Sequence, residues 1–153
     1  MSVALLNPEL MMLNIEGHNE DDVLNYMSNI LLSKGFVKDS YPSAIIKREN
    51  EFSTGLPGNG FGVAIPHTDS EHVNQSVMAV GLLKKPVKFK MMGNHDELID
   101  VEVCFMLALK ESHSHIQVLQ SLMNVIQDAS VMKKIKNVAT QSELFELLSA
   151  NIE

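Results

Sequence analysis

Apolar residues recur at helical spacing in four segments of the chain. In residues 19–35 ("NEDDVLNYMSNILLSKG") they stand three and four positions apart, after an Asn cap and an acidic first turn, and the segment ends at a Gly. Residues 40–52 predict a second helix, with Pro42 in its first turn and a polar C-terminal half facing water or a site. Residues 114–128 and 140–150 repeat the helical pattern, each opening with a candidate capping box.

The apolar runs in the middle of the chain are shorter and predict strands. Residues 61–65, 76–83, 87–89 and 98–109 are apolar, partly alternating, and bounded by Pro, Gly or Asn. Residues 53–60 ("STGLPGNG") are dense in turn formers and predict a loop. Helices on both sides of a block of strands predict a single α/β domain over residues 1–153, a sandwich in which helices flank a mixed β-sheet. The order of the strands does not follow from this pattern.

Composition narrows the class of protein. The 153 residues include 45% hydrophobic and 20% charged residues, as in an ordinary globular domain. The net charge of −7 and the scattered Lys and Arg disfavour nucleic acid and favour a partner with a basic patch. We expect a cytoplasmic protein, because no signal-peptide pattern and no membrane-length apolar run is present. Cys104, the single cysteine, lies in an apolar run and is expected to be buried and structural.

His67 is the most distinctive candidate for chemistry. It follows an apolar strand and Pro66, whose missing N–H ends regular sheet pairing, and it precedes a polar segment. This pattern favours an imidazole presented at a sheet edge. On the pattern alone, a histidine that only caps the strand end is the more common case. A metal site built from His67, Asp69 and His72 is a third interpretation, but "HTDSEH" matches no familiar spacing of metal ligands.

Two other residues could assist His67. His115 is predicted at the first position of a helix, where unpaired backbone N–H groups and the helix dipole attract anions such as phosphate; His113 could serve instead. Arg48 could bind phosphate oxygens through its guanidinium. A neutral imidazole is a nucleophile that can carry a phosphoryl group. The sequence contains no P-loop or kinase glycine signature, which favours a carrier phosphorylated by another protein, without a cofactor or metal.

These residues fall within a recognisable signature. Residues 47–69 ("KRENEFSTGLPGNGFGVAIPHTD") closely resemble the IIA components of the bacterial phosphoenolpyruvate-dependent sugar phosphotransferase system (PTS), of the fructose/mannitol type. The resemblance extends over about residues 7–150 and implies that family's α/β sandwich. It also implies that His67 is phosphorylated, that His115 stabilises the phosphoryl group and that Arg48 neutralises its charge. Thr54 is expected to support the site through its hydroxyl.

The resemblance also implies the partners. In this family the histidine takes its phosphoryl group from the phosphocarrier protein HPr and passes it to a cysteine of a IIB component, which serves a membrane IIC permease. Residues 64–73 and 86–94 look most like the galactitol-type branch. No direct contact with the sugar is expected, so the sequence does not reveal which sugar is transported. The alternative function is a regulator of the nitrogen-PTS type that acts through protein contacts.

Overall fold

The β-sheet at the centre of this computed structural model is built on one long hairpin. Strands β4 (Val77–Met91) and β5 (Asn94–Ala108) pair antiparallel. Strand β1 (Leu6–Ile15) runs parallel to β4, and the short β3 (Gly62–Ala64) runs parallel to β5. Strand β2 (Gly55–Leu56) pairs antiparallel with β3 and reaches the end of β4 through Gly55 and Met91. The sheet is therefore mixed, as predicted. The structure describes residues 5–111 and 115–152.

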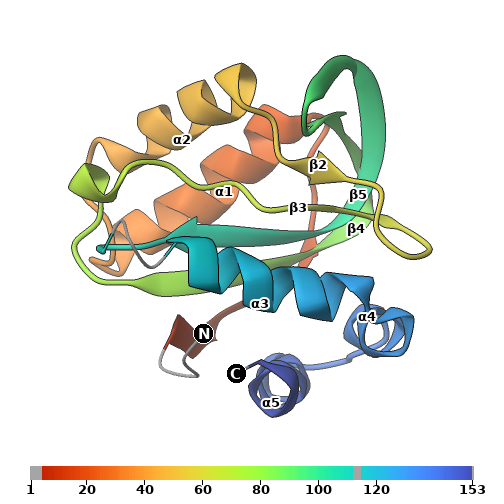
Figure 1. Ribbon diagram of the computed structural model, residues 1–153. Coiled ribbons are helices and arrows are strands. Elements are labelled where there is room, and N and C mark those ends of the chain that lie inside the picture. The colour runs from red at the N-terminus through yellow and green to blue at the C-terminus, as the bar shows by residue number, and fades with distance from the viewer. Residues whose placement is uncertain (1–4, 112–114, 153) are drawn as a thin grey trace.

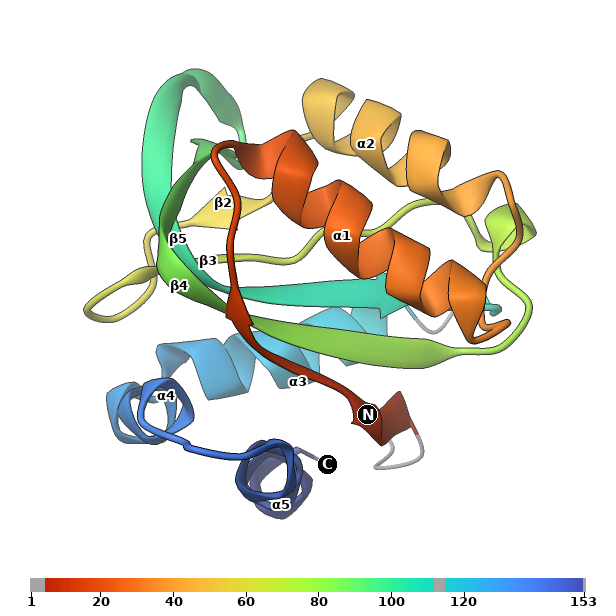
Figure 2. The same cartoon turned by 180° about the vertical axis from the view of Figure 1, so that it is seen from behind.

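Helices cover both faces of this sheet (Figures 1 and 2). Helices α1 (Glu20–Ser33) and α2 (Tyr41–Glu51) lie on one face, and α3 (His115–Gln127), α4 (Ala129–Lys136) and α5 (Gln141–Asn151) lie on the other. Successive strand residues point to opposite faces, so the core divides into two clusters. Val103 belongs to the cluster beneath α3–α5, whereas its neighbour Cys104 belongs to the one beneath α1 and α2. The predicted α/β sandwich is confirmed.

The predicted helix ends match local hydrogen bonds. The side chain of Asn19 accepts a hydrogen bond of 2.9 Å from the backbone N–H of Asp22 at the start of α1. Thr140 does the same for the N–H of Glu143 at the start of α5, at 3.1 Å. Each cap satisfies a backbone donor that has no partner within the helix. The predicted cap Ser114 lies outside the described residues.

Some elements differ from the prediction. The apolar runs at residues 76–83 and 87–89 belong to one continuous strand, β4, and the predicted loop at residues 53–60 contains the two-residue strand β2. Strand β1 and helix α4 were not predicted. Helix α4 begins after Asp128, whose carboxylate accepts hydrogen bonds from the backbone N–H groups of Ser130 and Val131. Among residues 5–111 and 115–152, no helix has the length and apolarity needed to cross a bilayer.

Candidate functional site

The chain leaves the sheet just before His67. Strand β3 ends at Ala64, two residues before Pro66. The carbonyl oxygen of Pro66 still accepts a hydrogen bond of 2.9 Å from the N–H of Leu107 on β5, so the backbone remains attached to the sheet up to this point. Proline has no N–H to extend the ladder, and His67 emerges half-buried at the end of the sheet.

The His67 ring is oriented by its own backbone. Its Nδ1 lies 2.8 Å from the carbonyl oxygen of Ile65, two residues earlier. A carbonyl oxygen can only accept a hydrogen bond, so Nδ1 must carry the proton and donate it. In the neutral ring, Nε2 therefore carries the lone pair. This tautomer makes Nε2 the nucleophilic nitrogen.

The surroundings of His67 favour the neutral ring. Burial lowers the pKa of His67, and the positive charge of Arg48 lowers it further. The hydrogen bond to Ile65 and the negative charge of Asp69 act in the opposite direction, but the net shift of the pKa is downward. The imidazole consequently remains uncharged to a lower pH than an ordinary histidine.

Arg48 approaches this site from the last turn of α2. Its guanidinium carbon lies 4.5 Å from the centre of the Phe52 ring, a cation–π arrangement that holds the side chain at the end of the helix. Phe52 itself is 58% exposed. Arg48 is thus close enough to lower the pKa of His67, and it is half-buried.

Thr54 is buried and connects α2 to the strand that precedes His67. Its hydroxyl accepts a hydrogen bond of 3.1 Å from the backbone N–H of Ile65. The same hydroxyl donates to Glu49 Oε1 at 2.8 Å, and the Thr54 backbone N–H donates to Glu49 Oε2 at 2.8 Å. Thr54 therefore contacts the backbone beside His67 rather than the imidazole.

Sequence reasoning missed the importance of Glu49. It placed this residue in a polar half-helix facing water or a site, whereas the side chain is only 1% exposed and faces the interior beside Thr54. The signal was present: Tyr41, Ile45 and Glu49 are spaced by four residues, and all three are buried on the same face of α2. Desolvation raises the pKa of Glu49 to about 7, although both hydrogen bonds from Thr54 act to lower it.

The structure describes the backbone of His115 but not its side chain. Helix α3 does begin at His115, as expected. The side chain of His115, and His113 as a whole, lie outside the described residues. The choice between these two histidines as the second residue of the site therefore stays a prediction.

His72, which the metal interpretation required, is engaged elsewhere. Its Nδ1 lies 2.8 Å from the hydroxyl oxygen of Ser40, at the start of α2. Within residues 5–111 and 115–152, no group of three His, Cys, Asp or Glu side chains is arranged to hold a metal ion.

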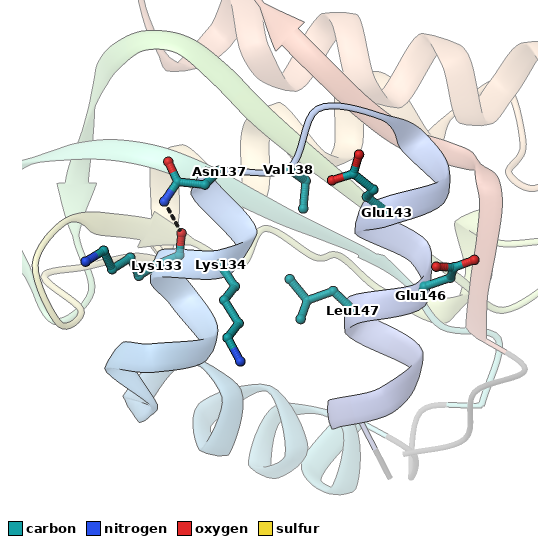
Figure 3. Close-up of a pocket in the computed structure, with 7 residues that line it drawn as sticks. All are labelled: Lys133, Lys134, Asn137, Val138, Glu143, Glu146 and Leu147. Atoms are coloured by element: carbon teal, nitrogen blue, oxygen red, sulfur yellow. Dashed lines mark hydrogen bonds between the residues drawn. The ribbon is translucent and has the colours of Figure 1, made fainter.

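A surface hollow between α4 and α5 lies apart from these residues. It is lined by Lys133, Lys134, Asn137, Val138, Glu143, Glu146 and Leu147 (Figure 3). Asn137, the residue after α4, donates a hydrogen bond of 2.9 Å to the carbonyl oxygen of Lys133 in the last turn of that helix. The hollow contains none of the residues around His67.

Comparison with known protein families identifies the family of this chain. The family described as "Phosphoenolpyruvate-dependent sugar phosphotransferase system, EIIA 2" matches residues 4–151. The chain belongs to this family. The galactitol-specific EIIA component of Escherichia coli K12 is 30% identical to this EIIA chain over 119 residues, which cover 76% of the chain and 77% of the relative. The fructose-specific EIIABC component of Bacillus subtilis is 26% identical over 149 residues, which cover 95% of the chain but 22% of that longer protein.

Solved structures share the EIIA fold. The cryptic mannitol-specific enzyme IIA of Escherichia coli superposes with a TM-score of 0.78 at 18% identity, covering 98% of this chain and 99% of that one. The Escherichia coli mannitol IIA in complex with phosphorylated IIB gives 0.74 at 21% identity, covering 95% and 99%. The nitrogen regulatory IIA of Neisseria meningitidis also gives 0.74, at 20% identity, covering 95% and 97%. Components of this family are phosphotransferases, and this chain is one by membership.

Proposed function

We propose that this protein is the phosphoryl-carrier IIA component of a sugar PTS, with His67 as the residue that carries the phosphoryl group. The observation that supports this most directly is the 2.8 Å contact between His67 Nδ1 and the Ile65 carbonyl oxygen, which leaves the lone pair on Nε2. The lowered pKa of His67 supports it as well, because only the neutral ring can attack phosphorus.

The proposed reaction has two transfers. In the first, the Nε2 lone pair of His67 forms a bond to phosphorus while the P–N bond of the phosphohistidine in HPr breaks, and that electron pair returns to the imidazole of HPr. The Nδ1 proton stays on His67, hydrogen-bonded to Ile65, and stabilises the ring as positive charge develops. In the second, a cysteine thiolate of a IIB component forms a bond to phosphorus while the Nε2–P bond breaks, and that electron pair returns to Nε2, so that the His67 ring becomes neutral again. Such transfers depend mainly on positioning and charge neutralisation.

The phosphoryl oxygens need positive partners, and two are proposed. Arg48 supplies a permanent charge near His67. His115 opens α3, where the first backbone N–H groups of the helix also favour an anion. We assign His115 the stabilisation of the phosphoryl group and Thr54 the support of the backbone beside His67.

The system served is proposed to transport galactitol or a similar polyol, because the galactitol-specific EIIA is 30% identical. A membrane IIC permease and cytoplasmic localisation belong to the same proposal, since the donor HPr and the IIB acceptor work on the cytoplasmic side of that permease. The carrier is not expected to bind the sugar, because only the phosphoryl group passes through it.

The test is the intact mass of the protein after incubation with phosphoenolpyruvate, enzyme I and HPr. We expect one acid-labile phosphoryl increment on the wild type and none on His67→Gln, with ³¹P NMR placing phosphorus on Nε2. His67→Gln must keep the circular dichroism spectrum and melting transition of the wild type. An unmodified wild type, with HPr shown to be phosphorylated, would contradict the proposal.

A regulator of the nitrogen-PTS type is the second candidate, favoured by the fold shared with the Neisseria nitrogen regulatory protein. The two functions separate at the second transfer. A sugar carrier donates its phosphoryl group to a galactitol-type IIB, so the IIB cysteine becomes phosphorylated as His67 loses its phosphoryl group. A regulator accepts the group on His67 and donates it to no sugar-specific IIB.

A further inference from the structure

The least expected group near the site is the buried carboxylate of Glu49. We infer that Glu49 is a positioning residue for the phosphoryl transfer: it fixes the Thr54 hydroxyl, which fixes the backbone at Ile65 and thereby the direction of the His67 imidazole. This inference rests on the proposed function and adds to it a residue that touches neither the phosphoryl group nor His67.

The connection is continuous from α2 to the imidazole. Glu49 Oε1 and Oε2 each accept a 2.8 Å hydrogen bond from Thr54, one from its hydroxyl and one from its N–H. The Thr54 hydroxyl oxygen then accepts the Ile65 N–H at 3.1 Å. The Ile65 carbonyl oxygen finally accepts His67 Nδ1–H at 2.8 Å. Every contact in this series is made by a residue that is buried or half-buried.

Glu49 determines which way the Thr54 hydroxyl points. A hydroxyl has one proton and can rotate to place it on any nearby acceptor. Because that proton is directed to Glu49, the oxygen lone pairs are directed to the N–H of Ile65. A side chain with one acceptor oxygen, such as Gln, cannot accept from both the hydroxyl and the N–H of Thr54. The hydroxyl is then free to turn, and the Ile65 N–H loses a fixed partner.

The backbone around Ile65 determines the orientation of the His67 ring. The N–H of Ile65 belongs to the peptide before its Cα, and its carbonyl belongs to the peptide after it. Thr54 holds the first, and the Leu107 N–H holds the next carbonyl, that of Pro66. The carbonyl that orients His67 is therefore held between two fixed points, one of which depends on Glu49.

A purely structural role explains the burial poorly. A carboxylate removed from water destabilises a protein unless it is paired, and an apolar residue of similar volume often packs at least as well. The two preceding residues on this face of α2, Tyr41 and Ile45, show that the face can be filled by large apolar side chains. Both Glu49 oxygens instead accept hydrogen bonds from a single residue, Thr54, which contacts the backbone near His67.

The test measures single-turnover transfer from phosphorylated HPr to Glu49→Gln, Thr54→Val and the double variant. Thr54→Ser keeps the hydroxyl, and Leu144→Ala is a control that removes fully buried volume from α5 without touching this series. We expect roughly 10- to 100-fold slower transfer in Glu49→Gln and Thr54→Val, no further slowing in the double variant, and near wild-type rates in Thr54→Ser. The final mass increment on His67 should be unchanged.

A second readout does not depend on transfer. Long-range ¹H–¹⁵N NMR of the unphosphorylated protein should show the Nδ1–H tautomer of His67 in the wild type, and a mixture of tautomers in Glu49→Gln and Thr54→Val. Wild-type tautomer and rate in these two variants would overturn the inference, as would slowing that merely follows melting temperature in the way Leu144→Ala does. If the wild type accepts no phosphoryl group, the proposed function fails, and the tautomer measurement still decides whether Glu49 positions His67.

Discussion

At the scale of single residues, the site depends on two shifted pKa values that have different causes. His67 is shifted downward by burial and by a neighbouring positive charge. Glu49 is shifted upward by burial, against two hydrogen bonds. The first shift keeps the His67 ring neutral to a lower pH, as the proposed phosphoryl transfer requires, and the second makes the stability of the protein depend on pH.

Replacing Arg48 should raise the pKa of His67. In the wild type the acidic midpoint of phosphoryl uptake should lie below about 6.5, the ordinary histidine pKa, because the ring must be neutral to react. Arg48→Gln removes a positive charge and should move this midpoint upward, whereas Arg48→Lys should keep it low. NMR titration of the His67 ring checks the pKa directly, and an unchanged midpoint in Arg48→Gln would contradict the assignment.

Glu49 should make the folded state less stable as pH rises from about 4.5 to about 7. The folded protein keeps the Glu49 proton up to a pKa of about 7, whereas the unfolded chain loses it near 4.5, so the folded state binds more protons within this window. The loss should approach about 3 kcal/mol at most. Glu20 strengthens this shift and Lys90 weakens it. Urea unfolding at several pH values measures this loss. The free energy of unfolding of the wild type minus that of Glu49→Gln should fall across this window, and a constant difference would refute the prediction.

At the scale of elements, the site depends on how closely β2 approaches its neighbours. A Cβ added at Gly55 would lie 2.6 Å from the carbonyl oxygen of Lys90 on β4, closer than atoms can pack. Gly55 follows Thr54 directly, so a displacement of β2 would reach the contact between Thr54 and Ile65. A two-residue strand thus holds one end of the site in place.

Gly55→Ala should therefore impair both stability and transfer. We expect about 1–3 kcal/mol lower stability from the enforced displacement, together with slower phosphoryl uptake on His67. The control is Gly93→Ala in the β4–β5 turn, where φ is +78° and nothing lies within 4 Å of the added Cβ. This variant should lose roughly 1–2 kcal/mol through backbone strain alone. Thermal unfolding measures the stability of the two variants, and single-turnover experiments measure their phosphoryl uptake. Equal transfer rates in Gly55→Ala and Gly93→Ala would contradict the prediction.

Elements with a long, regular pattern could be predicted from the sequence, and short or irregular ones could not. The helices of residues 20–33 and 141–151 have apolar periodicity and side-chain caps. Strand β1 contains Pro8 and a run of three buried residues, so it lacks alternation, and its place in the sheet comes from pairing with β4. Helix α4 has only eight residues, too few for a period to stand out.

The same distinction applies to the site. The place of His67 at the end of the sheet could be predicted, because proline marks the end of its strand locally, and its role in phosphoryl transfer stays a prediction. The proposed roles of Glu49 and Thr54 depend on the hydrogen bond between Thr54 and Ile65, eleven positions further along the chain, which only the tertiary structure brings together. A polar residue inside a helix otherwise resembles a solvated one, and its burial shows only in the four-residue spacing from Ile45.

At the scale of the whole molecule, the two helical layers pack against opposite faces of one sheet, each over its own core cluster. Cys104 lies at the centre of this arrangement on β5, fully buried, and burial raises its pKa well above that of a free thiol. Its reactivity should therefore report opening of the whole domain rather than of one loop.

Labelling of Cys104 by a thiol reagent should follow global unfolding. In native buffer the reaction should be orders of magnitude slower than at an exposed cysteine introduced by Ser142→Cys, and its rate should rise with urea in parallel with the unfolding equilibrium. Mass spectrometry of timed samples measures both sites in one protein. Fast labelling of Cys104 that is insensitive to urea would show that the sheet opens locally.

The strand that leads to His67 is only three residues long, and it lies between both helical layers: Val63 belongs to one core cluster and Ala64 to the other. Residues far apart in the chain thus determine where a single imidazole sits. A synthetic peptide of residues 60–69 would contain His67 and Ile65 but neither Thr54 nor Leu107, which hold the backbone around them. A transplanted copy of this site would therefore need α2, β2, β3 and β5 together, because each contains or adjoins a residue in the hydrogen bonds that hold the backbone around His67.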